Sequence, residues 1–453
     1  MKYADDEPIG APEFEGLVHS VGPFASPPRV AVATSGGVDS IALCLLTHRW
    51  ASARGGTCRA LVVDHGLRPA SAGECHRVVA WLARGGIEAH ILEWAGCKPI
   101  HGIQEAAREA RYELLSSWCR DHGLRDLLLA HHRDDQAETF LLRLGCKSGL
   151  DGLAAMAAVS RRTGIRVVRP LLDMPKARLV ATVNDLGHPW IEDPSNRDSR
   201  FARSRIRGLL PALNAAGVTA QGIAVSARRL GRARAALEHY ASELVRDCVQ
   251  SHEAGFCWLD RDALFAAPDE VGLRVLSRVV SAVGARSAPP RYDRLERAYT
   301  EIASGKASKG RTLAGCRIIG RTGRLLICRE ARGAGHSVTL HPGQSRRWDA
   351  RFDVRVDGHA LSDPERTCEV RRLGVEGWRI MMEDTETRLR ARDSEIPAAA
   401  HATLPALWDH VGLVDVPHLE YRRKGSGLAL DARFTPDRPL VFPPFSGSVP
   451  LSG

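Results

Sequence analysis

Repeated strand–helix units over residues 29–171 constrain the fold more than any other feature of this sequence. Short runs rich in β-branched and aliphatic residues alternate with longer segments whose apolar residues recur at helical spacing. The expected strands are Arg29–Thr34, Arg59–Asp64, Glu88–Trp94, Asp126–Ala130 and Val167–Leu171. The expected helices between them are Asp39–Arg49, Glu74–Arg84, Gln104–Arg120 and Asp135–Leu144. This alternation predicts a doubly wound α/β fold with a parallel sheet, whose ligands bind at the carboxyl ends of the strands.

The chain is too long for this α/β domain alone. At 453 residues it is expected to hold two to four domains. We interpret 1–27 as a flexible acidic lead-in, 28–215 as the α/β domain, 216–332 as a mainly helical domain and 343–453 as a small C-terminal domain of mixed or β structure. Three tryptophans of the last domain are candidates for stacking on RNA, but we expect them to be core residues: Trp348, Trp378 and Trp408.

Charge and cysteine usage narrow the class of protein. The formal net charge is +10, and eight arginines with no Asp or Glu occupy residues 199–237. This stretch is either an RNA-facing surface or a solvated helix face. The 11 cysteines are odd in number and form no Cys-x-x-Cys, which favours a reducing cytoplasm over a disulfide framework. No apolar run approaches the roughly 20 residues that cross a bilayer, so we expect no membrane partner.

The hexapeptide Ser35-Gly36-Gly37-Val38-Asp39-Ser40 follows an expected strand and opens a helix. Glycines let the backbone approach an anion, and a helix N-terminus supplies unpaired N–H groups and a positive dipole end. The Gly-Lys-Ser/Thr ending of a Walker A loop is missing. A phosphate site with an acidic residue in place of that lysine suggests that Asp39 holds a magnesium ion.

A second polar cluster, His131–Thr139, directly follows the fourth expected strand. Asp135 and Glu138 are three residues apart and share one face of the helix that begins there. Helix capping accounts for an acidic residue in the first turn, but not for the whole cluster at the end of a strand. Carboxylates that converge beside a phosphate loop repel each other unless a cation lies between them, so this cluster is a candidate site.

These segments resemble two nested families. The hexapeptide is similar to the loop of the PP-loop ATP pyrophosphatases, which cleave ATP between the α- and β-phosphates. The run His131–Leu144 resembles the signature of the tRNA(Ile)-lysidine synthetase family. Five further segments resemble that family and occur in its order: Asp64–Arg68, Gln104–Tyr112, Arg169–Leu172, Trp190–Asn196 and Arg203–Pro211. The resemblance implies that residues 28–215 form a PP-loop (HUP-like) ATP-binding catalytic domain and that 216–332 form a tRNA-contacting domain.

The resemblance also implies an activity. The family uses ATP and Mg²⁺ to activate C2 of the wobble cytidine in the CAU anticodon of tRNA(Ile) by adenylating its carbonyl oxygen, and free L-lysine then displaces AMP to give lysidine. The implied ATP-binding residues are the whole hexapeptide Ser35–Ser40, which includes Val38, together with Asp64 and His65, where the adenine and ribose would lie. Asp39 and Asp135 are the implied magnesium ligands. The other implied site residues are His131 and Arg111 for phosphate or adenylate, with Arg108 as an alternative. Glu138 is implied either to orient the site or to attract the lysine amine, and Arg205 to face either the target nucleotide or ATP.

Three alternatives remain open at this point. A tRNA thiolase of the same superfamily would need a cysteine pair or an iron–sulfur cluster, and no cysteine spacing here indicates one. An amidotransferase-type synthetase would need an ammonia source, and no glutaminase-like domain is evident. A non-catalytic RNA-binding protein would not require both intact polar clusters.

Overall fold

The computed structural model describes residues 6–96, 98–99, 102–162, 164–192, 200, 202–286, 288–306, 310–358 and 367–441. The chain divides into two compact units, the first from Met1 to Ala235 and the second from Ala236 to Pro444. Each unit has its own hydrophobic cores, and each is described by itself below.

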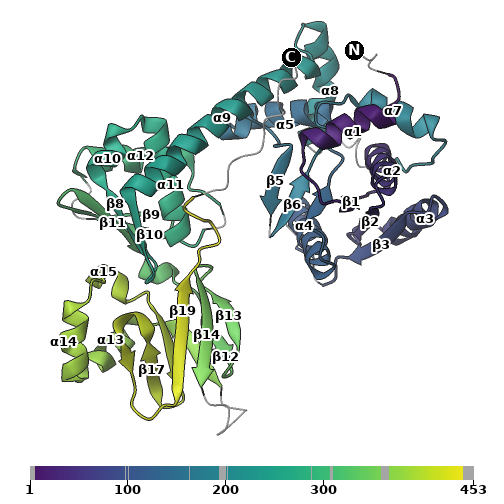
Figure 1. The fold of residues 1–453 in the computed structure, drawn as a ribbon. Helices are drawn as coiled ribbons and strands as arrows, with labels where there is room; N and C mark the ends of the chain where they lie inside the picture. Colours follow the sequence, from purple (N-terminus) through teal and green to yellow (C-terminus); the bar gives the residue numbers. More distant parts are fainter. Residues whose placement is uncertain are drawn as a thin grey trace. The chain divides into compact units, whose positions relative to one another are not determined.

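A six-stranded sheet organises the first unit, in the order β3-β2-β1-β4-β6-β5 (Figure 1). The first five of these strands are mutually parallel, and β5 is an antiparallel edge strand. The predicted doubly wound parallel sheet is therefore confirmed, with one added hairpin. The strands are β1 (Arg29–Ala33), β2 (Thr57–Asp64), β3 (Glu88–Glu93), β4 (Asp126–Leu128), β5 (Val159–Arg162) and β6 (Ile165–Val168).

Helices cover both faces of this sheet because each strand sends alternate side chains to opposite sides. In β1, Val30 and Val32 lie in one core with residues of α2, α3 and α7, whereas Ala31 and Ala33 lie in a second core with residues of α4. The helices are α2 (Val38–Ser52), α3 (Ser71–Arg84), α4 (Ile103–Asp121), α5 (Arg133–Gly145), α6 (Leu150–Leu153) and α7 (Lys176–Asp185).

The expectation of a flexible lead-in over residues 1–27 is wrong for most of that segment. Residues Ala11–Ser20 form helix α1, and Phe14 and Val18 are buried in the core that contains α2. Arg178 of α7 pairs with Glu13, at 2.6 Å, which fixes α1 further. The apolar residues at 14, 17, 18 and 21 have the spacing of one helix face, a signal that the acidic composition hid.

The arginine-rich stretch lies on two helices, α8 (Ala202–Ala215) and α9 (Ala220–Cys248).

In the described part of the chain, no single helix is long and apolar enough to cross a membrane. By length and composition alone, α8 and α9 pass that test only as a pair, across a bend of 104°.

The second unit combines helices with antiparallel sheets. Its first part is the sheet β7-β8-β11-β10-β9, packed against α11, and the segment predicted as mainly helical therefore also contains a sheet. The elements are β7 (Val249–His252), β8 (Phe256–Asp260), α10 (Arg261–Ala266), α11 (Asp269–Val283), α12 (Tyr292–Ala303), β9 (Arg311–Leu313), β10 (Cys316–Arg321), β11 (Arg324–Arg329) and the 3₁₀ turn η3 (Ala331–Gly333).

The remainder of the second unit is mixed α and β. It contains the sheets β12-β15-β16-β17-β18 and β13-β14-β19. Trp348 and Trp408 are buried in its cores and Trp378 packs against one of them, which confirms the expectation of core residues. The elements are β12 (Val338–Leu340), β13 (Ser345–Trp348), β14 (Phe352–Gly358), β15 (Cys368–Arg372), α13 (Gly374–Glu383), α14 (Thr385–Asp393), α15 (Ala398–His401), β16 (Pro405–Asp409), β17 (Gly412–Val416), η4 (Pro417–Leu419), β18 (Tyr421–Arg422) and β19 (Leu428–Phe434).

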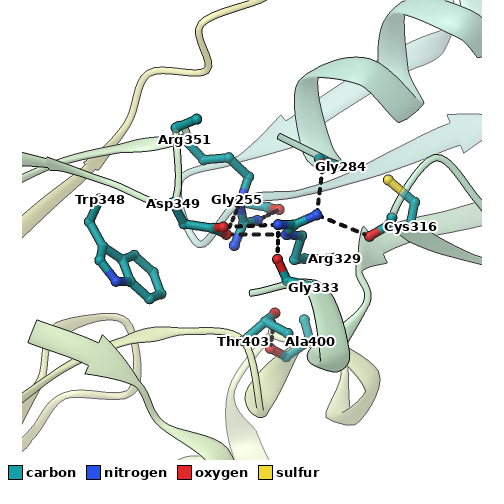
Figure 2. Close-up of polar contacts among 12 residues, drawn as sticks. Gly255, Gly284, Cys316, Arg329, Gly333, Trp348, Asp349, Arg351, Ala400 and Thr403 are labelled. Carbon is teal, nitrogen blue, oxygen red and sulfur yellow. Dashed lines mark hydrogen bonds and ion pairs between the residues drawn. The ribbon is translucent and has the colours of Figure 1, made fainter. Parts of the chain in front are cut away.

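A buried Arg–Asp–Arg cluster holds together three segments of the second unit (Figure 2). Asp349, in the turn between β13 and β14, accepts hydrogen bonds from Arg351 at 2.8 Å and from Arg329 of β11 at 2.9 Å. Arg351 also donates to the backbone oxygen of Gly255, at 3.1 Å. Gly255 has no side chain, so its backbone can approach this guanidinium. A Cβ at this position would lie 3.0 Å from Nη1 of Arg351 and 2.6 Å from the ring of Phe352.

Candidate active site

The site lies where the strand order of the first sheet reverses. From β1 the chain proceeds to β2 and β3 on one side, and then returns to place β4 on the other side of β1. The segments that follow β1 and β4 therefore diverge to opposite faces and leave a crevice at the carboxyl ends of these strands. Both of the predicted polar clusters follow these two strands.

The first cluster forms a tight turn between β1 and α2. The Ser40 hydroxyl donates to the Gly37 carbonyl at 2.9 Å and accepts from the backbone N–H of Ser35 at 3.1 Å. Gly36 has a φ of +86°, and a Cβ there would lie 2.5 Å from the side chain of Val78. The buried Ser40 thus shapes the loop, and glycine is required at position 36 for both conformation and space.

The second cluster forms the start of α5, and His132 joins it to the first. The imidazole Nε2 of His132 lies 3.6 Å from Oδ2 of Asp39 and 3.5 Å from Oδ2 of Asp135. Its Nδ1 lies 3.6 Å from Oδ2 of Asp134. The structure therefore brings together the two carboxylates expected to share a cation, although their residues are far apart in the sequence.

Burial and charge set the protonation of this group. Burial alone lowers the pKa of His132, but the neighbouring carboxylates of Asp39, Asp135 and Asp134 outweigh burial and raise it above the ordinary value. Burial raises the pKa of Asp39, but His132 and the charges of Lys176 and Arg207 hold it below the ordinary value. Asp39 is therefore a carboxylate at neutral pH.

The residues fit Mg²⁺ if the ion is held jointly by protein carboxylates and by substrate phosphates. In the described ranges, no group of three or more His, Cys, Asp and Glu side chains is arranged to hold a metal by itself. Mg²⁺ commonly binds through one or two carboxylates together with substrate phosphates and water. Oδ1 of Asp39 is buried with no hydrogen-bond partner. An orphaned carboxylate oxygen, with a second carboxylate nearby, matches that donor set.

Four arginines act electrostatically on His131, the residue directly before His132. Burial and the charges of nearby arginines hold the pKa of His131 well below its ordinary value, so the imidazole is neutral. Arg111 is one of the predicted site residues, and Arg108 was the named alternative. The arginines that act on His131 are Arg169, Arg203, Arg111 and Arg108. This concentration of positive charge suits a phosphate or an adenylate.

Glu138 is fully buried on α5 and pairs with an arginine of α8. Its Oε1 accepts a hydrogen bond from Nε of Arg207 at 2.7 Å, and its Oε2 is buried without a hydrogen-bond partner. Arg205, the predicted residue of that segment, is exposed and donates to the backbone oxygen of Arg200. Among the described contacts, the arginine of this segment that meets α5's carboxylate is thus Arg207 rather than Arg205.

This pair supports a stability prediction. Replacing Arg207 with methionine is expected to lower the free energy of unfolding of the first unit by about 2–3 kcal/mol, because it leaves the buried carboxylate of Glu138 uncompensated. Arg205→Met is the matched control, with an expected change within about 0.5 kcal/mol. Urea unfolding followed by far-UV circular dichroism measures both. Equal stability of the two variants would contradict this role of Arg207.

Asp64 and His65 lie at the carboxyl end of β2. Asp64 accepts hydrogen bonds from the backbone N–H of Gly66 at 2.8 Å and from the Ser71 hydroxyl at 2.7 Å, so it shapes the turn before α3. Burial and the charge of Arg111 lower the pKa of His65, so Arg111 acts electrostatically on the histidine after β2 as well as on His131. The candidate segment Trp190–Asn196 is described only as far as residue 192, and Ile191 donates to the carbonyl of Gly36.

Sequence reasoning missed His132, Lys176 and Arg207. His132 was named only as part of the His131–Thr139 run, and its neighbour His131 was chosen for a direct role. Lys176 of α7 lies 3.7 Å from Oδ2 of Asp39 but follows it by more than a hundred residues. A lysine directly after Met-Pro gives no signal of a site when read by itself.

Comparisons with known proteins show the family to which this chain belongs. Residues 12–213 match the family model described as a PP-loop domain. Among similar proteins, the tRNA(Ile)-lysidine synthase of Wolbachia pipientis wMel is 37% identical over 76% of this chain and 80% of its own length. That of Ruegeria pomeroyi is 34% identical over 90% and 93%, and that of Bradyrhizobium diazoefficiens is 40% identical over 77% and 98%. With its paired carboxylates beside a PP-loop and these relatives over most of its length, the chain belongs to the tRNA(Ile)-lysidine synthase family of PP-loop, ATP-binding ligases.

Proposed function

We propose that this chain is a cytoplasmic ligase that joins free L-lysine to C2 of the wobble cytidine in tRNA(Ile) with a CAU anticodon, using ATP and Mg²⁺. One observation carries the proposal: the carboxylates of Asp39 and Asp135 contact the same imidazole nitrogen of His132. Two segments that follow neighbouring parallel strands thereby form one site for a nucleotide triphosphate. The name of the relatives supports tRNA(Ile) and lysine as the substrates. This reaction needs no iron–sulfur cluster and no glutaminase.

The first step is adenylation of the base. The backbone N–H groups at the start of α2 hold phosphate oxygens, and the helix dipole favours the negative charge there. Asp39 and Asp135 would hold Mg²⁺, which offsets the charge of the departing pyrophosphate when bound. The cytosine O2 attacks the α-phosphorus, and the bond to the β-phosphate oxygen breaks. The arginines around His131 are placed to stabilise the negative charge of the adenylate.

The second step is attack by lysine. The ε-amine, in its neutral form, attacks C2 of the adenylated cytosine, and AMP departs with the former O2. Glu138 is suited to hold the amine, because its Oε2 is buried and has no hydrogen-bond partner while Arg207 keeps the carboxylate in place. Burying a carboxylate oxygen without a hydrogen-bond donor costs stability. Such an oxygen therefore fits a contact with substrate better than a purely structural role.

The arginines of α8 and the first half of α9 provide a surface for RNA. Arg205, Arg229 and Arg232 are exposed, and the stretch contains no acidic residue. Phosphate contacts of this kind position a nucleic acid without reading its sequence. Recognition of the wobble base itself requires that the base leave its stack and enter the site.

Transfer of labelled lysine tests the proposal. The purified protein, with ATP and Mg²⁺, is expected to attach ¹⁴C-lysine to a tRNA(Ile) transcript with a CAU anticodon and to release one pyrophosphate for each lysine. A transcript with a GAU anticodon and labelled arginine serve as controls and should give no product. Asp135→Asn is expected to lower transfer by about 100-fold or more. No transfer by the wild-type protein, with ATP bound, would refute the proposed activity.

A further inference from the structure

The phosphate loop of this chain lacks the lysine that many phosphate loops carry, yet a lysine lies beside it in space. The residues Ser35–Ser40 include none. Nζ of Lys176, the first residue of α7, lies 3.7 Å from Oδ2 of Asp39, and the lysine side chain is 44% exposed. The ammonium group is thus at the open side of the loop, where it can reach a ligand.

Several contacts fix the position of Lys176. Its backbone N–H donates to Oδ2 of Asp134 at 3.1 Å, and the N–H of Arg133 donates to the carbonyl of Met174 at 2.9 Å. These bonds join the start of α7 to the start of α5. Leu179 and Val183 of α7 are buried in the core that contains α2. The lysine is therefore held by three elements of the site, and only its side chain is free to turn.

The charges around Asp39 favour an anion that is larger than one carboxylate. The helices α2, α5 and α7 all begin within the contacts just described, and each presents the positive end of its dipole there. Lys176 and His132 both lie near the same oxygen of Asp39. A divalent cation on Asp39 would repel the ammonium group of Lys176 at this distance unless phosphate oxygens lay between them.

We propose that Lys176 binds the β- and γ-phosphate oxygens of ATP and stabilises the pyrophosphate as it leaves, so that α7 supplies the lysine that the loop lacks. When the bond between the α-phosphorus and the bridging oxygen breaks, the electron pair stays on the pyrophosphate, whose negative charge at the leaving oxygen grows. An ammonium group at that position is worth more in the transition state than in the bound substrate. The inference rests on ATP use alone and not on the identity of the nucleophile.

Binding of three nucleotide probes tests this role. For Lys176→Met, titration calorimetry with ATP and with pyrophosphate, each with Mg²⁺, is expected to show affinities reduced about tenfold, as for the loss of one charge-assisted contact. The affinity for AMP should change less than twofold, because AMP lacks both phosphates. Lys176→Arg is expected to restore ATP binding to within about threefold of the wild type. Lys147→Met, an exposed lysine of the same unit, is the matched control and should bind all three probes normally.

The outcomes separate this inference from the proposed function. Normal ATP and pyrophosphate binding by Lys176→Met would overturn it, as would an equal loss of AMP binding, which would indicate a merely structural lysine. A melting temperature near that of the wild type verifies the fold, and Lys176→Gln replaces the methionine variant if that one fails to fold. A further outcome is that the wild type transfers no lysine to tRNA while Lys176→Met still loses affinity for ATP and pyrophosphate but not for AMP. In that case the proposed function would fail and this inference would stand.

Discussion

Asp39→Asn is expected to lower the rate of lysine transfer to tRNA by about a thousandfold, which corresponds to about 4 kcal/mol of lost transition-state stabilisation. The substitution keeps the size of the side chain but removes its charge. Asp39 is the residue on which the site converges: His132 and Lys176 both contact its Oδ2, and its Oδ1 is buried and unpartnered. Loss of that charge leaves the ammonium group of Lys176 without its carboxylate partner and removes an expected magnesium ligand.

Two measurements distinguish this result from simple unfolding. AMP affinity of Asp39→Asn should stay within about threefold of the wild type, since AMP lacks the β- and γ-phosphates whose charge Mg²⁺ would offset. The Mg²⁺ concentration that gives half-maximal pyrophosphate release should rise. Asp185→Asn, which changes an exposed carboxylate at the end of α7, is the control and should retain full activity. Turnover by Asp39→Asn near the wild-type rate would refute Asp39 as a magnesium ligand and this crevice as the active site.

Asp349→Ala is expected to destabilise the second unit by about 3–5 kcal/mol, because removal of one partner from a buried ion pair leaves the other charge uncompensated. Here two guanidinium groups depend on one carboxylate. Arg351 is fully buried and the side chain of Arg329 is nearly so, and Nη2 of Arg351 already lacks a hydrogen-bond partner (Figure 2). Burial lowers the pKa of Arg351, while Asp349 opposes that shift.

Thermal unfolding of the full chain measures this effect. Because the two units have separate cores, a lower melting temperature is expected for the transition of the second unit, with little change in the first. Asp353→Ala is the matched control: its pair with Arg347, at 2.8 Å, is exposed, and such pairs contribute about 0–1 kcal/mol. A melting curve of Asp349→Ala that coincides with that of Asp353→Ala would contradict a structural role for the cluster.

The sequence by itself determined the parallel sheet and the two polar clusters that form the site. Short apolar runs and helical apolar patterns are local properties, so the parallel strands β1 to β4 and their helices could be predicted from neighbouring residues. Ser35–Ser40 and His131–Glu138 could be assigned to one crevice because carboxyl ends of parallel strands meet at one edge. Helix α1 was missed because its charged composition outweighed the spacing of Phe14, Leu17 and Val18.

Only the tertiary structure decided which side chains meet. The contacts of Lys176 with Asp39 and of Arg207 with Glu138 join residues that are 137 and 69 positions apart, and no local pattern encodes such a pairing. Neither does a local pattern choose His132 over His131 as the bridging imidazole, since that depends on how α5 leaves β4. Spacing along the chain fixes which elements form, whereas the packing of those elements fixes the distances on which charge interactions depend.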